Sequence, residues 1–330
     1  MEVTIKDVAK LAGASVATIS RVLNKSASVS PETTKVVNDA IKELNYRPNF
    51  LGRNLRKRET HVILALMPST EHTYYSEILS GMQVKGNEYG YDILMSTTNS
   101  YLQLEMRLLG MLSNRTVDAA VLMGTRLDKD ALEELSRNNF IALCCEPVEG
   151  SDVLTVTINN EQAAYDAISH FILKGHRNIA MVSTSIRAPS SIERENGYMR
   201  ALKEHNITFN PDYMYYGSYD YKCGGEALEK FMNMDNKPTA VFTISDFLAA
   251  GVVKKASEMN IDIGKELEVI GFDNISMAEL YTPSISTVEQ PCFELGKTVI
   301  DLVIENISGK NNHGRVFLDH RLMLRQSTGD

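Results

Sequence analysis

Arg21 is the side chain near the start of the chain with the clearest chemical use, because its planar guanidinium can pair bidentately with O6 and N7 of guanine. Val16, Ala17 and Ser20 share the outward face of the same predicted short helix, which begins after Ser15. In a helix-turn-helix, the side chains near the start of the second helix meet the edges of the bases. These four outward residues are therefore candidates to read DNA.

Three short helices are predicted within the first 44 residues, and they would position these side chains. Thr4 and Asp7 have the spacing of a capping box, and Gly13 suits a left-handed helix stop. The run Ser30-Pro31-Glu32 is typical of a third helix start. The predicted apolar face of that third helix consists of Val36, Val37, Ala40, Ile41 and Leu44. Two short amphipathic helices also open many soluble chains, so the pattern alone leaves that reading open.

The charge of the 330-residue chain is divided unevenly along the sequence. Residues 1–60 contain 11 Lys and Arg against 6 Asp and Glu, whereas the remaining 270 contain 23 against 36. A basic start on an acidic remainder suits a polyanionic partner at one end of the molecule. The basic part coincides with the predicted helix-turn-helix, which favours DNA as that partner.

A short basic segment at residues 49–58 follows the third predicted helix. Arg53 and Arg56 could contact phosphates, and Leu55 could act as an apolar wedge in the minor groove, paired with its symmetry mate. A helix of about two turns containing Gly52 is marginal alone in water, so we expect it to order on a partner. The alternative is an ordinary basic linker between domains.

The remainder of the chain alternates short β-rich runs with helical patterns. Predicted strands lie at 62–66, 92–96, 119–122, 141–143, 155–158, 178–182, 240–243 and 268–272. This alternation predicts an α/β fold with parallel sheets and right-handed crossovers, and 270 residues suffice for two doubly wound lobes.

Polar and aromatic side chains follow several of these strands. Ligands of open parallel sheets bind outside the carboxyl ends of the strands, so such residues are candidates for ligand contact. They are Tyr74, Tyr75, Ser190, Arg194, Tyr219, Asp246 and Asp273. A tyrosine can stack on a sugar ring, and Arg or Asp can exchange paired hydrogen bonds with hydroxyls. Each also has a structural reading: Asp246 and Ser190 as helix caps, Arg194 and Asp273 as an ion pair between lobes, and the tyrosines as packing residues.

The chain resembles the LacI/GalR family of transcriptional regulators over its whole length. The resemblance is carried by Ile5-Lys6-Asp7-Val8-Ala9, the run from Ser15 to Asn24, Tyr46-Arg47-Pro48-Asn49, Ile270-Gly271-Phe272-Asp273-Asn274 and Gln290-Pro291. It implies a helix-turn-helix domain at 1–47, a hinge helix or linker at 48–60, and an effector-binding and dimerisation domain at 61–330. This last domain would have the type I periplasmic-binding-protein-like fold with two discontinuous lobes.

The same resemblance implies the partners and their contacts. A homodimer would bind a pseudo-palindromic double-stranded operator through Thr4, Ser15, Val16, Ala17, Thr18, Ser20, Arg21, Asn24, Tyr46, Asn49, Arg53, Leu55 and Arg56. The seven strand-end residues match the family's effector-site positions. No leucine-heptad tail follows the last predicted elements, so a dimer is the expected assembly.

The effector is the open part of this interpretation. Ala188 stands where purine-responsive relatives carry arginine, which argues against a purine. The carbon-control branch of the family uses phosphorylated HPr as coregulator, but here Lys297 replaces a small residue and Asp301 replaces the arginine that meets HPr. We therefore favour a small sugar or sugar phosphate, with phosphorylated HPr as the alternative, and repression as the mode of action.

Other classes of protein are less compatible with the sequence. A solute-binding protein needs an export signal, which the opening residues do not resemble, and an enzyme needs a nucleophile, base or phosphate loop, none of which has a recognisable motif. No stretch is apolar enough to span a membrane, so we expect a cytoplasmic protein. Cys144, Cys145, Cys223 and Cys292 lack ligand spacing, which predicts buried thiols, no metal and no disulfide. No cofactor is expected.

Overall fold

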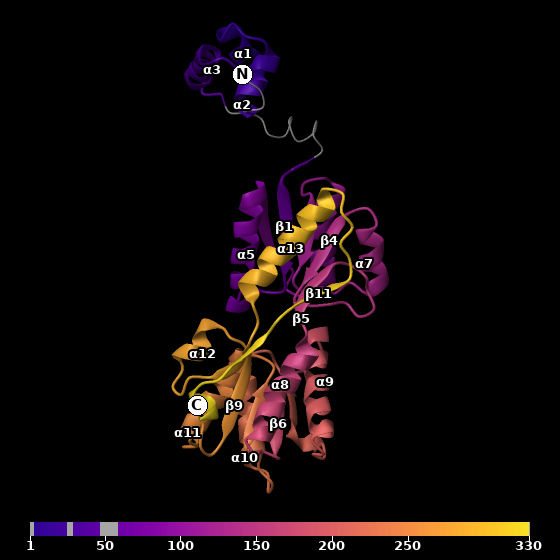
Figure 1. Cartoon of the computed structure of the whole chain (residues 1–330), viewed down its shortest axis with the longest axis vertical. Helices are drawn as coiled ribbons and strands as arrows, with labels where there is room; N and C mark the ends of the chain where they lie inside the picture. Colours follow the sequence, from indigo (N-terminus) through magenta and orange to yellow (C-terminus); the bar gives the residue numbers. More distant parts are fainter. Residues whose placement is uncertain (1–2, 25–28, 47–58, 330) are drawn as a thin grey trace. The chain divides into compact units, whose positions relative to one another are not determined.

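The computed structural model describes residues 3–24, 29–46 and 59–329, which form two compact units divided between Glu59 and Thr60 (Figure 1). We call the described part of the first unit the head and the second unit the body. No helix in these ranges is long and apolar enough to cross a bilayer.

The head consists of the three predicted helices, α1 (Ile5–Leu11), α2 (Val16–Asn24) and α3 (Pro31–Glu43). Asp7 Oδ2 accepts from both the backbone N–H and the hydroxyl of Thr4, at 2.8 and 2.7 Å, and Gly13 has the left-handed φ of 60°. The small core contains Val8, Ala9, Ile19, Val37 and Ala40. Val36, which we predicted on the apolar face of the third helix, is instead 50% exposed, because α3 turns that position away from α1 and α2.

The amino-terminal lobe of the body (N-lobe) is built on a six-stranded parallel sheet. Its order is β11-β5-β4-β3-β1-β2. The strands are β1 (Val62–Met67), β2 (Asp92–Thr97), β3 (Ala119–Leu122), β4 (Phe140–Cys144), β5 (Thr155–Ile158) and β11 (Arg315–Leu318). Helices α5 (Thr73–Tyr89) and α13 (Cys292–Ile307) pack on one face, and α6 (Leu102–Ser113) and α7 (Lys129–Ser136) on the other. Each face of the sheet therefore has its own hydrophobic core.

The second lobe (C-lobe) contains the other six-stranded sheet, ordered β12-β10-β9-β8-β6-β7 and parallel except for β12. The strands are β6 (Ile179–Thr184), β7 (Met214–Gly217), β8 (Ala240–Thr243), β9 (Glu268–Asp273), β10 (Ser286–Glu289) and β12 (Arg321–Met323). The helices are α8 (Asn160–Leu173), α9 (Pro189–Glu204), α10 (Tyr221–Met232), α11 (Asp246–Glu258) and α12 (Ser276–Leu280). Two short 3₁₀ turns lie at Pro211–Tyr213 and Gln326–Thr328.

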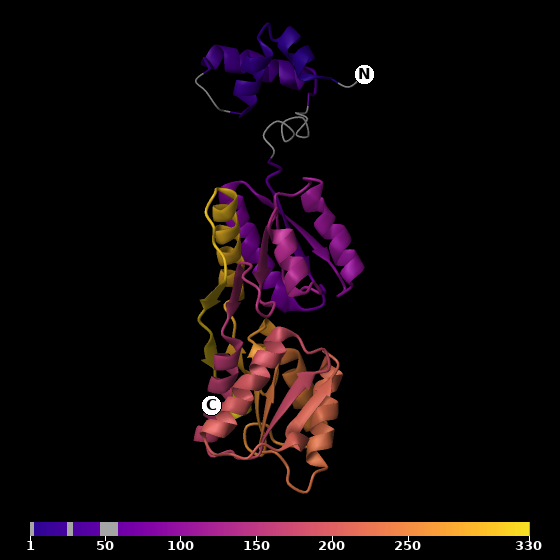
Figure 2. The same cartoon turned by 90° about the vertical axis from the view of Figure 1, so that its right-hand side faces the viewer.

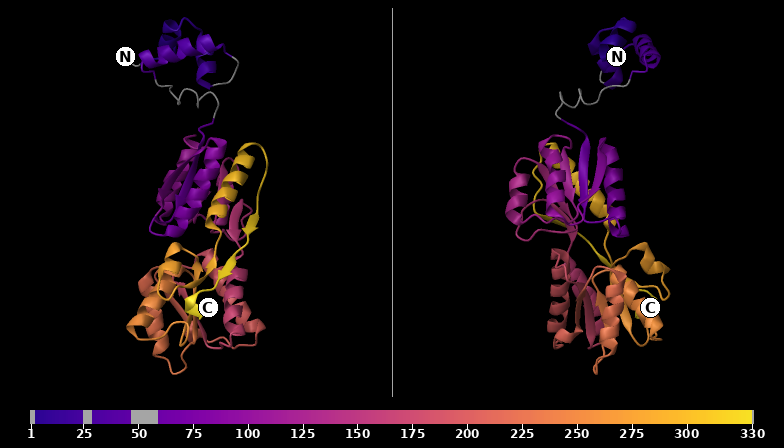
Figure 3. Two further views of the ribbon diagram at one scale, coloured as in Figure 1. Left: turned by 60° about the vertical axis from the view of Figure 1, so that its left-hand side comes forward. Right: turned by 180° about the vertical axis from the view of Figure 1, so that it is seen from behind.

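The chain crosses between the lobes three times, as Figures 2 and 3 show for the body. The crossings join β5 to α8, β10 to α13, and β11 to β12, so each lobe is assembled from separate stretches of sequence. This confirms the predicted discontinuous lobes. Three neighbouring connections are also the natural place for one lobe to hinge against the other.

Candidate ligand cleft and nucleic-acid interface

The first turn of α2 presents the predicted DNA readers. Ser15 caps this helix, since its Oγ accepts from the backbone N–H of Thr18 at 3.1 Å and lies 2.9 Å from the Thr18 hydroxyl. Val16, Ala17 and Arg21 are exposed, while Ile19 on the opposite side of the helix is fully buried in the head. The turn of small residues from Ala12 to Ser15 thus fixes α2 by its apolar face and leaves its reading face open.

The other predicted DNA contacts divide into three groups. Thr4 is exposed at the start of α1, whereas Thr18 and Ser20 are half-buried on α2. Tyr46 packs against the head core, so its ring also has a structural role. Asn49, Arg53, Leu55 and Arg56 lie outside the described residues, as does the predicted hinge helix, and Asn24 is described only as the last residue of α2.

A cavity of about 630 Å³ lies between the two lobes of the body, at the carboxyl ends of their strands. Its walls follow β1, β3 and β4 in the N-lobe and β6, β8 and β9 in the C-lobe. In the N-lobe sheet β2 and β3 lie on opposite sides of β1, and in the C-lobe sheet β7 and β8 lie on opposite sides of β6. Open parallel sheets bind ligands at such points, where the connections leave a strand in opposite directions. The volume is in the range of small-molecule sites. Of the seven predicted ligand residues, Tyr74, Tyr75, Ser190, Arg194, Tyr219 and Asp273 line it.

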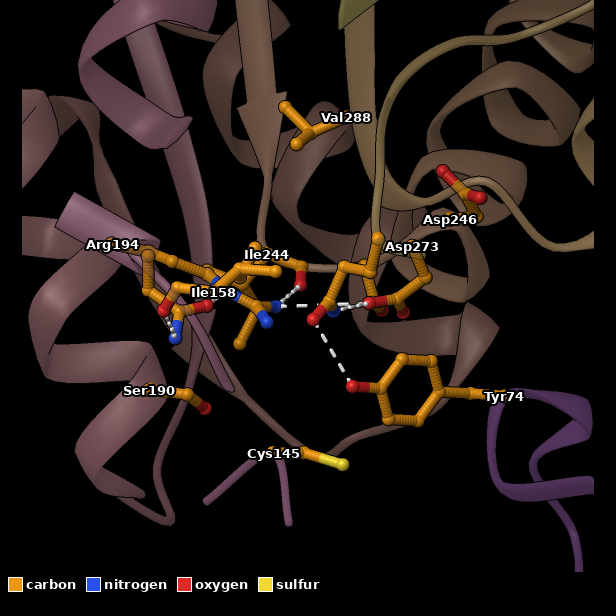
Figure 4. A network of polar contacts seen from close by, with 12 residues as sticks. Tyr74, Cys145, Ile158, Ser190, Arg194, Ile244, Asp246, Asp273 and Val288 are labelled. Carbon is orange, nitrogen blue, oxygen red and sulfur yellow. Dashed lines mark hydrogen bonds and ion pairs between the residues drawn. The ribbon is translucent and has the colours of Figure 1, made fainter. Parts of the chain in front are cut away.

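Arg194 and Asp273 form the polar floor of this cavity on the C-lobe side (Figure 4). The Arg194 side chain is fixed by donating from Nε to Asn160 Oδ1 at 3.0 Å and from a terminal nitrogen to the carbonyl of Ile244 at 2.5 Å. It stacks 3.6 Å above the centroid of the Phe272 ring and lies 4.0 Å from Asp273 Oδ1. This guanidinium is therefore held rigidly before any ligand arrives.

A chain of hydrogen bonds connects this floor to the N-lobe. Gln290, at the second crossing, donates to Asp273 Oδ1 at 2.7 Å and accepts from the Tyr74 hydroxyl at 3.0 Å. Burial raises the pKa of Asp273 to about 6, against the opposing effects of Arg194 and Gln290. The pocket thus contains a carboxyl whose protonation changes close to neutral pH.

Glu146 contacts the C-lobe from the opposite wall. Its carboxylate oxygens accept from the Ser190 hydroxyl at 2.5 Å and from the Ser190 backbone N–H at 3.2 Å. Ser190 lies in the first turn of α9, where backbone N–H groups have no partner within the helix. Burial raises the pKa of Glu146, although the two bonds from Ser190 act in the other direction.

Aromatic rings from both lobes line the same cavity. His72 and Tyr75 come from the loop and helix after β1, whereas Tyr219 and Phe247 come from the C-lobe. His72 meets Tyr219 edge-on at 4.9 Å between centroids and Phe247 at 5.6 Å. Burial lowers the pKa of His72, which favours the neutral imidazole in this apolar setting.

Asp246 is the predicted ligand residue that does not line the cavity. Its Oδ2 accepts from the backbone N–H of Ile275 at 2.9 Å, and Figure 4 shows its carboxyl pointing away from Arg194 and Tyr74. Burial raises its pKa well above the ordinary value for an aspartate. Its neighbour Phe247 is the residue that reaches the cavity.

The structural readings of these residues are also corrected by the geometry. Arg194 and Asp273 do approach each other, but both belong to the C-lobe, so their pairing does not bridge the lobes. The caps of α9 and α11 are Ala188 and Ser245, because Ser190 and Asp246 lie inside the first turns. The lobes are instead joined by Ser190 with Glu146 and by Arg315 with Glu193, whose ion pair measures 2.8 Å.

Glu146, Gln290 and Cys145 line the cavity together with Phe247, although none of them was predicted as a ligand residue. Glu146 lies two positions after β4 and Gln290 directly follows β10, so the strand-end rule that found the other residues also applies to them. Cys145 has a left-handed φ of 71° and is buried, as are the other three cysteines, as predicted.

Comparisons with known proteins place these two units together in one family. Residues 4–49 match the model of bacterial regulatory proteins of the lacI family, and residues 168–328 match a periplasmic binding protein-like domain. Catabolite control protein A of Priestia megaterium is 34% identical over 331 residues, which cover 99% of this chain and all of the relative.

Solved structures agree with that assignment. The Lac repressor dimer bound to operator and the anti-inducer ONPF superimposes with a TM-score of 0.90 at 23% identity, covering 99% of both chains. A complex of the transcriptional regulator CelR with cellobiose has a TM-score of 0.73 at 27% identity, covering 99% of this chain and all of that one. The chain therefore belongs to the lacI family of bacterial regulatory proteins, and it is a transcriptional regulator and not an enzyme.

Proposed function

We propose that the protein is a repressor that binds a pseudo-palindromic DNA operator as a homodimer and responds to a small sugar-like effector in the interlobe cavity. The observation that carries this proposal is the exposed Arg21 on a capped, anchored α2, in a chain whose body holds a pre-formed cavity. In this proposal residues 1–47 bind DNA, 48–60 connect, and 61–330 bind effector and dimerise. The DNA partner places its action in the cytoplasm.

The DNA-binding part of the proposal assigns different tasks to different side chains. Arg21, with Val16, Ala17 and Ser20 beside it, would read base edges in the major groove. Thr4, Ser15, Thr18, Asn24, Tyr46 and Asn49 would fix the register of the head on the duplex. Arg53 and Arg56 would contact phosphates on either side of a minor-groove step opened by Leu55.

The effector part rests on the cavity floor. Arg194 and Asp273 have the donors and acceptors that neighbouring sugar hydroxyls need, and Tyr74, Tyr75 and Tyr219 supply flat apolar surface. Ser190 would contact the effector at the mouth of α9. The likeness to the CelR complex with cellobiose supports a sugar as the class of ligand.

Coupling between the sites would follow from the lobes. The cavity walls come from both lobes, so a bound effector favours one interlobe arrangement over another. The two hinge segments of a dimer would follow that arrangement and set whether both heads fit one operator. An effector that weakens operator binding through this coupling would be an inducer, and one that strengthens operator binding would be a corepressor.

A homodimer is supported by an exposed apolar surface at the β2 edge of the N-lobe. We call it the β2 face and define it as Leu94, Tyr101, Leu102 and Met106 on the α6 side of the edge strand, with Met95 on its α5 side, all of which are exposed. Strand β2 pairs only with β1 in the described sheet, so its outer edge is free of hydrogen-bonded neighbours. A second copy of the chain on this face would cover both the edge and the apolar side chains.

The alternative coregulator, phosphorylated HPr, is less favoured by the surface of α13. Asp301 accepts from the Tyr89 hydroxyl at 2.9 Å and pairs with Lys85 at 3.1 Å, and Lys297 pairs with Glu294. Lys297 of α13 and Lys85 of α5 are thus already paired with acids, and Asp301 adds a negative charge to α13. Such a surface offers little attraction to a phosphoprotein.

The first experiment is selection of DNA by the purified full-length protein from a random duplex pool at about 0.15 M salt. Enrichment of an inverted repeat is the expected result and would identify the operator. Repeating the selection with sugars, sugar phosphates and phosphorylated HPr would separate a missing corepressor from a wrong proposal. If no condition enriches any sequence, the proposal of a sequence-specific regulator fails for this chain.

A further inference from the structure

The charged side chains that line the cavity differ in whether their partner is an oppositely charged group or a hydrogen-bond donor. Asp273 has Arg194 at 4.0 Å, Glu105 is occupied by the hydroxyl of Thr125 and the backbone N–H of Arg126, and Arg187 pairs with Glu195. Glu146 differs from these, because the charge of Arg194 acts on it without an ion pair, and none of the ion pairs found within residues 59–329 includes it. Its donors are the hydroxyl and backbone N–H of one serine at the start of α9.

The guanidinium of Arg194, whose charge acts on Glu146, cannot easily turn to it. Arg194 is 7% exposed, donates to Asn160 and Ile244, and is held over the Phe272 ring. An ionised carboxylate has about four lone-pair sites, of which the two bonds from Ser190 occupy half. A half-buried carboxylate in an apolar wall is costly unless a cation or further donors reach it.

The rings around this carboxylate have the composition of an ammonium site. Tyr75 and Tyr219 lie close enough to Glu146 that its charge contributes to raising the pKa of both hydroxyls, and Asp273 acts on them in the same way. His72 and Phe247 complete the aromatic wall. Aromatic rings beside a carboxylate attract organic cations, because the negative ring faces and the anion both attract positive charge.

We propose that the effector of this cleft carries a protonated amine, held between the Glu146 carboxylate and the rings of Tyr75 and Tyr219, and therefore belongs to the class of amino sugars. This inference rests on the proposed function and narrows its ligand. The hydroxyls of the same molecule bind to Arg194 and Asp273. A phosphate ester at the Glu146 end is disfavoured by repulsion, since Arg126 is exposed at the rim, where water screens its charge.

Titration calorimetry on the full chain tests this with matched probes. D-glucosamine, D-galactosamine and D-mannosamine are compared with their parent hexoses, their N-acetyl derivatives, which lack the charge, and their 6-phosphates. At least one amine is expected to bind at least 10-fold more tightly than its parent and its N-acetyl derivative. Glu146→Gln should abolish this preference, Glu146→Asp should retain part of it, and Glu134→Gln, on the exposed side of α7, should leave it unchanged.

Three results would overturn the inference. The first is that none of the three amines binds more tightly than its parent hexose. The second is that a 6-phosphate binds more tightly than every amine. The third is that no amine binds to protein that still selects its operator. Each of these results would contradict the amino-sugar effector and leave the proposed DNA-binding regulator unaffected. If the same preparation selects no DNA under any condition, the proposed function itself is at fault, so the two failures are distinguishable.

Discussion

Arg21 differs from its neighbours on α2 in the number of hydrogen bonds that it can direct at one base. Val16 and Ala17 offer apolar contact, which discriminates mainly through the thymine methyl group, whereas a guanidinium recognises guanine through two bonds at once. Because Ile19 anchors the helix in the head core, Arg21 is presented from a fixed position. Its substitution should therefore affect sequence preference, not only affinity.

We predict that Arg21→Ala weakens operator binding by about 1 to 3 kcal/mol and relaxes preference at one base pair in each half-site. Competition binding against single-base operator variants measures both effects. Lys42→Ala, an exposed cation in the last turn of α3, is the matched control and should leave base preference unchanged. If Arg21→Ala lowers affinity equally for every operator variant, Arg21 contacts phosphate instead.

Asp273 is predicted to make the stability of the body depend on pH. Its folded pKa of about 6 exceeds the ordinary value of 3.8, so the folded state holds its proton more tightly than the unfolded chain does. The free energy of unfolding should thus fall as pH rises between about 4 and 6, by roughly 3 kcal/mol from this group. Urea unfolding at pH 4.5 and 7 should show Asp273→Asn gaining on the parent protein as pH rises. Parallel pH profiles for the two proteins would contradict this assignment.

Six of the seven residues predicted from their positions after strands line one cavity. The exception, Asp246, has a physical cause. A residue at the start of a helix after a strand can point into the cleft or back toward the next strand. At this position Asp246 turns toward the backbone of Ile275, and Phe247 takes the outward direction. Composition does not distinguish these two rotations, so the sequence alone could not exclude Asp246.

At the scale of elements, helix pairs in the C-lobe depend on close backbone approach. In α9, a Cβ atom on Gly197 would lie 2.1 Å from the carbonyl oxygen of Glu161 in α8, and 2.9 Å from Ala164 Cβ. Since backbone cannot yield as a flexible side chain does, Gly197→Ala should destabilise the body by about 1 to 3 kcal/mol. Gly110 in α6 has open space around its Cβ position, so Gly110→Ala should be neutral or stabilising by up to about 1 kcal/mol. Chemical denaturation of both variants tests the pair; equal effects would refute the packing argument.

Strands that contain an apolar run were predictable, whereas β11 and β12 were not. The eight strands expected from apolar runs appear as β1 to β6, β8 and β9, with ends within one or two residues of their predicted positions. Strands β11 and β12 have four and three residues, contain no fully buried position, and gain their order by pairing with β5 and β10 far away in sequence. Tertiary context defines such strands, so local pattern carries little signal for them.

For the whole molecule, the lobes meet through few direct polar contacts besides the crossings. Ser190 with Glu146 and Glu193 with Arg315 both join α9 to the N-lobe. Helix α9 therefore contacts the cavity through Ser190, and through Glu193 it contacts β11, the strand that leads into the third crossing. A ligand that displaces Glu146 from Ser190 would change the interlobe arrangement at the same helix that carries Arg194, which ties ligand recognition to lobe movement.

The final prediction concerns assembly, because a palindromic operator is read by two heads. Met95 is 56% exposed on the edge strand of the β2 face, so Met95→Glu places a charge in the proposed dimer contact and should convert the dimer into monomer at micromolar concentration. Sedimentation velocity measures this, and operator affinity should fall as the dimer dissociates. Leu173→Glu is the control, since Leu173 is 81% exposed in the other lobe, at the end of α8, and should leave the assembly unchanged. A Met95→Glu protein that remains dimeric would place the interface on another face of the body.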